Sequence, residues 1–578
     1  MPKEKSEIHE EDLRIEIPEE EQKRGKGTFF REPSVMTTEE APPAEQLPVF
    51  MFTKFDFLAL ILIGIIGFFS VISTFNGIGF SWDEAYYYQP SIDAVGWLGA
   101  FFRNPLNALK PGIIDEYWGT IPELPALSKM LLGLSQQFLS RFLGPYRGMR
   151  IAPAIAFAAT LALLYVFGFY LRGRFVASGA VLFYWLMPRV FGHAHIAGTE
   201  TLANFFMLLS VGFFIKSVKK NRQFWAIATC VATGCALAIR INSILLIPLL
   251  ILFAYLYWRK TAIHTMFFLI VGTPLVLVIV SPLFWHNTVE RLLEFILFFV
   301  SHKQTAVYYF GTIYVPGGAP VPWDYPWIMT AITIPVMTLV FIIVGIAASF
   351  HRIKEGTTTL VLACALFPLL VSSFPGTPKY DGIRLFMPAF PFLALIGGLG
   401  LSWTVQGITS LYPKRIKPLA TILASVMLLL VLINGLVAIR GIRPYYLSYY
   451  NYLIGGVNGA FNAGMEVTYW GEAVNEDVID ELNSALPQNA SLKVLALHDK
   501  VFAYLQDWLI LRQDIKIDGA PPYDYHLLLV RKSFFMRPER YLYENWRPQK
   551  VFTVNGVPLV ALYKTGERFE KEWPRLTK

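Results

Sequence analysis

The chain has 578 residues, of which 54% are hydrophobic and 15% aromatic, whereas only 16% are charged. A soluble protein carries about 25% charged residues, so this composition excludes an ordinary soluble domain and predicts an integral membrane protein. The formal net charge of +8 does not point to nucleic acid as a partner, because the basic residues cluster in short loops between apolar runs, where they are a signal of membrane topology.

Residues 1–50 are rich in Glu, Lys and Pro and contain no short apolar segment of the kind found in signal peptides. We expect them to form a disordered cytoplasmic tail. The three cysteines, Cys230, Cys235 and Cys364, all lie within apolar runs. This placement predicts packing roles rather than a disulfide framework or a Cys-x-x-Cys metal site.

Eleven apolar runs follow the tail, and each is close to the roughly 17 to 25 residues that cross a bilayer as a helix. They cover residues 55–75, 149–171, 175–192, 199–217, 223–240, 243–258, 263–281, 327–349, 357–375, 385–405 and 417–439. With the N-terminus inside, all five basic loops fall on the cytoplasmic side, as the positive-inside tendency requires. Residues 51–440 are therefore predicted to be an α-helical, multi-pass part in the cytoplasmic membrane, with outer loops 76–148 and 282–326.

Two further segments are expected on the outer side. Residues 127–142 have apolar side chains at helical spacing interrupted by polar ones, which predicts an amphipathic helix lying in the membrane interface. After Arg440 the apolar runs stop, and short helical and strand-like segments alternate. This alternation predicts a small extracytoplasmic α/β domain over residues 441–578.

Two adjacent carboxylates, Asp83 and Glu84, follow the first apolar run and are flanked by Trp82 and Tyr86. Neighbouring residues of a helix diverge by about 100°, so only one of the two can point into a given site. A carboxylate in this position is a candidate general base. The alternative is a structural pair that caps a helix beginning after Ser81.

A second cluster of polar residues stands at the outer mouth of the third and fourth runs. It contains Arg189, His193, His195 and Glu200. The two histidines with Glu200 have residue types that bind divalent metals. The alternative is a pair of hydrogen-bonded interfacial histidines, with Glu200 at the N-terminus of the next helix.

The third cluster consists of cations predicted to face the outer side. Arg384 follows Asp381 at the entrance to the tenth run, and a guanidinium there suits an anion such as phosphate. Lys129, Arg240 and Lys379 are expected on the same side. A single such cation is often a headgroup anchor, but several on the outer side run against the positive-inside tendency.

The order of these motifs resembles a known family. The motifs are Trp82-Asp83-Glu84, the segment from Glu123 to Lys129, Pro188-Arg189 through Thr199-Glu200-Thr201, Asp381-Gly382-Ile383-Arg384 with Pro388 and Pro391, and Tyr469-Trp470-Gly471. Together they resemble the prokaryotic type of the dolichyl-phosphate-mannose protein mannosyltransferase-like group, family 39 and its relatives, among the GT-C membrane glycosyltransferases. The resemblance runs over about residues 55–475, and it departs from the family at Leu124-Pro125-Ala126, where members often have His-Pro-Pro.

The resemblance implies transfer of a hexosyl or pentosyl group from a polyprenyl-phosphate donor to a glycan, lipid or protein acceptor, with inversion at the extracytoplasmic face. By that resemblance Asp83 is the general base and Glu84 supports it. Arg384, Lys129, Arg240 and Lys379 are the expected ligands of the donor phosphate. The residues expected to line the site are Trp82, Tyr86, Arg189, His193, His195, Glu200 and Asp381. No cofactor is implied, and a divalent metal at His193, His195 and Glu200 stays an open alternative, as do a multi-pass transporter and an inactive lipid-linked-sugar binding relative.

Overall fold

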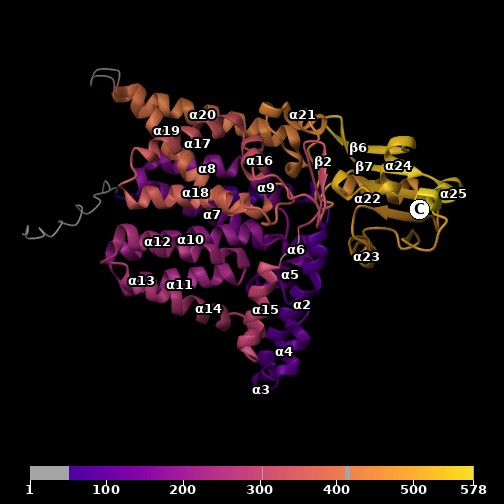
Figure 1. The fold of residues 1–578 in the computed structure, drawn as a ribbon, viewed down its shortest axis with the longest axis horizontal. Coiled ribbons are helices and arrows are strands. Elements are labelled where there is room, and N and C mark those ends of the chain that lie inside the picture. Colours follow the sequence, from indigo (N-terminus) through magenta and orange to yellow (C-terminus); the bar gives the residue numbers. More distant parts are fainter. Residues whose placement is uncertain (1–50, 302–303, 411–416, 577–578) are drawn as a thin grey trace, which may run out of the picture. The chain divides into compact units, whose positions relative to one another are not determined.

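The computed structural model describes residues 51–301, 304–410 and 417–576, and the tail predicted over residues 1–50 lies outside them. All eleven apolar runs are mainly helical within the described residues (Figure 1). The corresponding helices are α1 (Lys54–Ile72), α7 (Ile151–Arg172), α8 (Arg174–Trp185), α10 (Glu200–Lys220), α11 (Gln223–Leu237), α12 (Leu246–Trp258), the continuous segment α13 (Ile263–Phe267), η3 (Phe268–Gly272) and α14 (Thr273–Ile279), then α16 (Tyr325–Thr333) with α17 (Val336–Phe350), α18 (Gly356–Ser373), α19 (Phe390–Ser410) and α20 (Lys417–Ile442). Seven of the helical segments in the described part are long and apolar enough to cross a membrane.

Two of the predicted runs are divided at prolines. The run 175–192 ends as α8 at Trp185, and a short helix, α9 (Pro188–His193), begins with Pro188. The run 327–349 is split into α16 and α17 at Pro335. Proline has no amide hydrogen and clashes with the preceding turn, so it is favoured at a helix start and breaks a helix interior. Single helices over these two runs were therefore the wrong expectation.

The two long loops carry structure of their own. Residues 76–148 form α2 (Trp82–Arg103), α3 (Pro105–Ala108), α4 (Pro111–Trp118), α5 (Ala126–Leu143) and α6 (Pro145–Met149), and α5 confirms the helix expected over residues 127–142. Residues 282–326 contain α15 (Thr288–Val300) and an antiparallel hairpin of β1 (Val307–Tyr309) and β2 (Thr312–Tyr314), which were not predicted. α2 packs along α5 and contacts the C-terminal helix α23 (Asp499–Asp507).

The C-terminal residues form the expected α/β structure. A five-stranded sheet has the order β4-β3-β5-β7-β6, in which β3 is parallel to β4 and β5, and β7 is antiparallel to β5 and β6. The strands are β3 (Ser491–Leu495), β4 (Lys516–Ile517), β5 (Tyr525–Leu529), β6 (Lys550–Val554) and β7 (Val557–Lys564), and the helices around them are α21 (Gly456–Asn462), α22 (Glu476–Ala485), α23, α24 (Arg537–Asn545) and α25 (Gly566–Leu576). β5 is central and buried along its whole length.

An aromatic cluster joins this C-terminal part to the helical part. Trp508, just after α23, lies with its ring centroid 5.1 Å from Phe80, 4.8 Å from Tyr88 and 5.8 Å from Tyr146. Tyr504 stacks on Trp508 at 5.2 Å. Aromatic side chains bury large areas, so this cluster is a hydrophobic contact of the C-terminal part with α2, α6 and the residue Phe80 just before α2.

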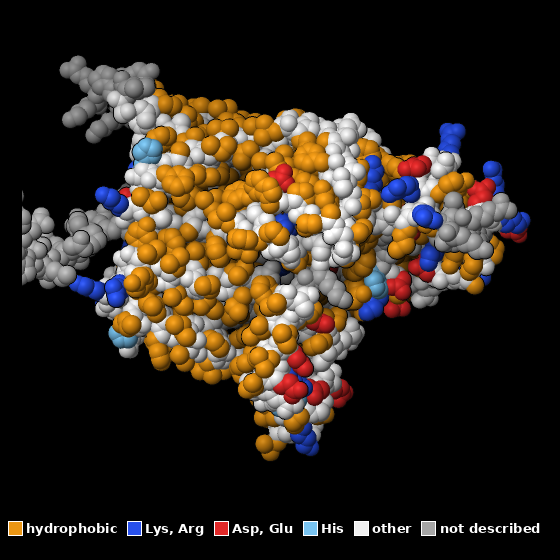
Figure 2. Space-filling model, in the orientation of Figure 1, with side chains coloured by type: hydrophobic (Ala, Val, Ile, Leu, Met, Phe, Trp, Pro, Cys, Tyr) orange, Lys and Arg blue, Asp and Glu red, His pale blue; other side chains and the backbone are white. Residues whose placement is uncertain are grey.

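The surface shows which part meets lipid. Hydrophobic side chains cover the visible face over the long helices, whereas charged side chains gather over the C-terminal elements (Figure 2). Outward-facing apolar residues include Phe57 and Phe69 of α1 and Ile422 and Val437 of α20, all of them exposed. Exposed apolar surface of this extent marks contact with a membrane.

Candidate active site

Asp83 lies in the first turn of α2 and is only partly buried. Ser81 caps this helix through a capping box in which the side chain of Glu84 accepts a hydrogen bond from the Ser81 amide at 2.9 Å. Asp83 Oδ2 accepts a hydrogen bond from Tyr87 Oη at 3.2 Å and pairs with Arg384. Asp83 Oδ1 has no protein partner among the described residues, and the side chain is 18% exposed.

Glu84 points away from Asp83 into the protein interior. Arg150 binds it with two hydrogen bonds, Nε to Oε1 at 2.7 Å and Nη2 to Oε2 at 2.8 Å, and both side chains are fully buried. The amide of Ala197 donates to Oε1 at 3.0 Å. With these partners and Ser81, Glu84 is saturated, so its part is to fix the start of α2 and thereby the position of Asp83.

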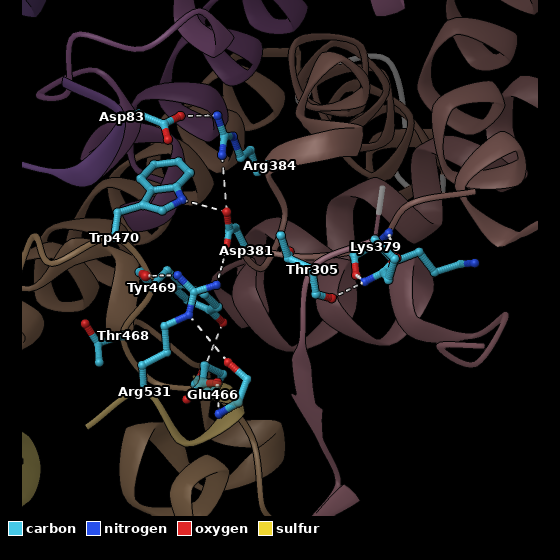
Figure 3. A network of polar contacts seen from close by, with 12 residues as sticks. Asp83, Thr305, Lys379, Asp381, Arg384, Glu466, Thr468, Tyr469, Trp470 and Arg531 are labelled. Atoms are coloured by element: carbon cyan, nitrogen blue, oxygen red, sulfur yellow. Dashed lines mark hydrogen bonds and ion pairs between the residues drawn. The ribbon is translucent and has the colours of Figure 1, made fainter. Parts of the chain in front are cut away.

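Arg384 is the centre of the polar cluster. It begins η5 (Arg384–Ala389), and each of its three guanidinium nitrogens meets a different carboxylate. Figure 3 shows the contacts with Asp83 and Asp381. Nε donates to Glu200 Oε1 at 2.7 Å, Nη1 to Asp381 Oδ2 at 3.2 Å, and Nη2 pairs with Asp83. Its guanidinium also lies 4.6 Å from the ring centroid of Trp470, a cation–π contact.

Arg240 supplies a second cation from the short connection between α11 and α12. Its Nη1 pairs with Glu200 and donates to Thr199 Oγ1 at 3.1 Å. Within the described part of the chain, Nε and Nη2 of Arg240 have no protein partner. Two guanidinium nitrogens of Arg240 are therefore available to a ligand, whereas each nitrogen of Arg384 already meets a carboxylate.

A cavity of about 940 Å³ opens beside this cluster. Its polar wall includes Tyr86, Tyr87, Arg240 and Arg384. Its apolar walls come from α10, α12, α15, α18 and α19 and include Met207, Leu246, Leu249, Phe298, Phe299, Phe367, Val371 and Phe392. A cavity with cations at one end and long apolar walls suits a ligand with an anionic head and a hydrocarbon body.

Burial changes the acid–base properties of the groups around the cavity. It raises the pKa of Asp83 above its ordinary value, and the guanidinium of Arg384 acts in the opposite direction. It also lowers the pKa of His193 to about 4, with Glu200 opposing the shift. A raised pKa favours proton acceptance by Asp83 at neutral pH, while His193 is neutral there.

The other two predicted phosphate ligands lie elsewhere. Lys129 is buried, and its ammonium donates to the carbonyl oxygens of Trp118 at 3.0 Å and Thr120 at 2.8 Å. Lys379 is likewise buried and donates to the carbonyl oxygen of Phe374 at 2.9 Å. Neither lysine is among the residues that line the cavity.

Three of the predicted lining residues, Trp82, Arg189 and His195, are not among the residues that line the cavity and have structural partners elsewhere. Arg189 donates to the carbonyl oxygen of Tyr449 at 3.0 Å and to Tyr469 Oη at 3.1 Å. His195 Nε2 is 2.6 Å from Thr74 Oγ1. Trp82 packs against the C-terminal part of the chain, and Tyr86 alone of the two flanking aromatics lines the cavity.

The geometry does not bring together the three residues considered as possible metal ligands. His195 faces Thr74, His193 packs against the ring of Trp470 at 5.1 Å, and Glu200 pairs with the two arginines. In the part of the chain that the structure describes, no group of three His, Cys, Asp or Glu side chains is arranged to hold a metal ion.

Two residues of the cluster were not predicted as site residues. Trp470 donates from Nε1 to Asp381 Oδ2 at 2.6 Å, and Arg531 donates from Nη2 to Asp381 Oδ1 at 2.8 Å. Trp470 belongs to the motif Tyr469-Trp470-Gly471, which contributed to the family resemblance but was given no role in the site. Arg531 follows a buried strand and has no local signal in the sequence.

With this geometry established, residues 125–302 match the family described as dolichyl-phosphate-mannose-protein mannosyltransferase. The structure is similar to that of ArnT from Cupriavidus metallidurans bound to undecaprenyl phosphate, with a TM-score of 0.50, 13% identity, and coverage of 88% of this chain and 97% of that one. The chain has the GT-C fold. The archaeal oligosaccharyltransferase AglB from Archaeoglobus fulgidus, in complex with an inhibitory peptide and a dolichol-phosphate, matches with a TM-score of 0.47 and 11% identity over 81% of this chain and 62% of that one. No curated protein sequence matches the chain. In this GT-C fold, the charged cluster comes from α2, the start of α10, the α11–α12 connection and the segment from Asp381 to Arg384.

Proposed function

We propose that the protein is an inverting glycosyltransferase that moves a sugar from a polyprenyl-phosphate donor to an acceptor hydroxyl, with Asp83 as the general base. The observation that carries this proposal is that Asp83 contacts Tyr87 and Arg384, which both line the amphiphilic cavity, while one of its carboxylate oxygens is unengaged by any described residue. The undecaprenyl phosphate named in the similar ArnT structure supports the donor class.

The chemistry follows from the residues around the cavity. Asp83 Oδ1 accepts the proton of the acceptor hydroxyl while the hydroxyl oxygen forms a bond to the anomeric carbon. The bond between that carbon and the phosphate oxygen breaks, and the electron pair leaves with the lipid phosphate. Attack opposite the leaving group inverts the anomeric configuration.

The two arginines have different parts in this reaction. Arg240 contacts the phosphate through the donors that the described residues leave unused, where negative charge develops on the leaving group. Arg384 is already bound to three carboxylates, so it orients Asp83 and adds positive potential. The apolar walls hold the hydrocarbon chain. Because the basic loops are expected on the cytoplasmic side, we propose that the site lies at the extracytoplasmic face of the cytoplasmic membrane, with residues 441–578 on the same side.

The test is an Asp83→Asn variant assayed for transfer from lipid-linked sugars. The donor is first identified by profiling the polyprenyl-linked sugars that accumulate in cells lacking the protein. We expect kcat to fall by about 10²- to 10⁴-fold, the usual contribution of a general base, while donor binding persists. NMR of the product should show the anomeric configuration opposite to that of the donor.

Asp115→Asn is the matched control, because Asp115 also pairs with an arginine, Arg291, but lies on α4 outside the cavity. It should keep wild-type turnover. Undiminished turnover by Asp83→Asn would remove the proposed mechanism. Movement of lipid-linked sugar across vesicles without transfer would favour the transporter alternative.

A further inference from the structure

Four charged side chains form a continuous chain from α2 to the C-terminal sheet (Figure 3). Asp83 pairs with Arg384, Arg384 Nη1 donates to Asp381 Oδ2 at 3.2 Å, and Arg531 Nη2 donates to Asp381 Oδ1 at 2.8 Å. The chain ends on Arg531, two residues after β5. A residue that follows the central strand of the C-terminal sheet is thus linked to the proposed base through two intermediates, Asp381 and Arg384.

Arg531 is held in place by its surroundings. Its side chain is 4% exposed, its Nη1 donates to the carbonyl oxygen of Tyr469, and its guanidinium lies 3.7 Å from the ring centroid of Phe534. The next turn is fixed by Glu466, which accepts hydrogen bonds from the amides of Lys532 at 2.8 Å and Ser533 at 2.9 Å. Arg531 therefore presents its Nη2 to Asp381 from a rigid position.

Asp381 needs these partners. Its backbone has a φ of +54° and precedes Gly382 at +67°, a left-handed conformation that aspartate tolerates better than most residues but that still costs energy. Its carboxylate is 5% exposed and accepts hydrogen bonds from the side chains of Trp470, Arg384 and Arg531. Removing one cation from a buried carboxylate leaves negative charge uncompensated, and here the cation that remains to balance it is Arg384.

We propose that Arg531 is a positioning residue for sugar transfer, which neutralises Asp381 and so leaves the guanidinium of Arg384 shared with Asp83. This inference rests on the proposed function, because it takes Asp83 as the base. Arg531 does not line the cavity, so it acts through Asp381 and Arg384 rather than on substrate. The C-terminal sheet then takes part in orienting the catalytic carboxylate.

The first test is Arg531→Met in the purified full-length protein. We expect kcat to fall by about 10- to 100-fold, which corresponds to a rise of about 1.4 to 2.7 kcal/mol in the activation barrier. KM for the donor should stay within about twofold of wild type, because the phosphate ligand Arg240 is untouched. Arg531→Lys should recover part of the loss, since it restores the charge but not the planar fork.

Arg512→Met is the matched control in the same C-terminal part. Arg512 also binds an aspartate with two hydrogen bonds, to Asp514 at 2.9 and 2.6 Å, and contacts none of the cavity residues. It should keep wild-type kcat. Equal losses in Arg512→Met and Arg531→Met would mean that only the stability of the sheet had changed, which would overturn the inference.

The second test is a double-mutant cycle with Asp381→Asn. If Arg531 acts through Asp381, adding Arg531→Met to Asp381→Asn should lower kcat by less than about twofold further. A full additional loss, or a wild-type kcat in Arg531→Met alone, would contradict the inference while leaving Asp83 as the base. A fully active Asp83→Asn variant, in contrast, would remove the proposed function itself.

Discussion

Replacing Arg240 with methionine tests the proposed phosphate site directly. Methionine keeps an unbranched apolar side chain but removes all guanidinium donors. Glu200, the carboxylate partner of Arg240, keeps its 2.7 Å hydrogen bond from Arg384 Nε, so the substitution does not strand a buried charge. The loss should therefore fall mainly on the ligand.

The magnitude follows from the unengaged donors of Arg240. A hydrogen bond to a charged group contributes about 1.5 to 3 kcal/mol, so losing one to the phosphate weakens binding by about 10- to 150-fold. We expect this increase in Kd for undecaprenyl phosphate bound to the purified protein. Arg240→Lys should give an intermediate value, because a lysine keeps the charge without the fork.

Two controls isolate the phosphate contact. Arg291→Met removes an arginine of similar exposure, 17% against 12%, that pairs with Asp115 outside the cavity, and it should bind undecaprenyl phosphate as wild type does. Undecaprenol, which lacks the phosphate, should bind wild type and Arg240→Met equally. An unchanged Kd for undecaprenyl phosphate in Arg240→Met would refute the assignment of Arg240.

Two further predictions concern stability. Glu84→Gln breaks the buried pair with Arg150 and should cost about 3 to 5 kcal/mol of unfolding free energy, seen as a lower Tm in detergent, whereas Glu116→Gln on the exposed side of α4 should leave Tm unchanged. The pKa of His193 is lowered to about 4 in the folded protein, so this side chain stays neutral there while the histidine of the unfolded chain takes up a proton below about pH 6.5. The contribution of His193 to the unfolding free energy is therefore complete above about pH 6.5 and is lost as pH falls towards 4. The drop in Tm over this range should be smaller in His193→Phe, and equal drops would contradict the assignment.

The helices and much of the polar cluster could be predicted because both depend on coarse properties of the sequence. Apolar runs of membrane length become helices whatever their neighbours are, and their alternation placed Asp83, Glu200 and Arg384 on one side, where the structure brings them together. The breaks at Pro188 and Pro335 required attention to single residues within runs that were judged by length.

The roles of individual cations could not be predicted in the same way. Lys129 and Arg240 look alike as charges near a membrane edge. What separates them is whether backbone carbonyls lie within reach, as those of Trp118 and Thr120 do for Lys129, and this depends on the path of a loop. Arg531 is 150 positions from Asp381, so no local pattern could connect the two.

The aromatic cluster on α2 has a consequence for how this polypeptide can be handled. Trp508 and Tyr504 cover Phe80, Tyr88 and Tyr146, so a truncation near residue 440 would uncover a row of large rings beside the helix that carries Asp83. Water would then meet apolar surface that the intact chain never exposes, and such surface promotes aggregation. Expression, crystallisation and directed evolution should accordingly keep the helical part and the sheet on one uninterrupted polypeptide, and an affinity tag belongs beyond α25 rather than between the two.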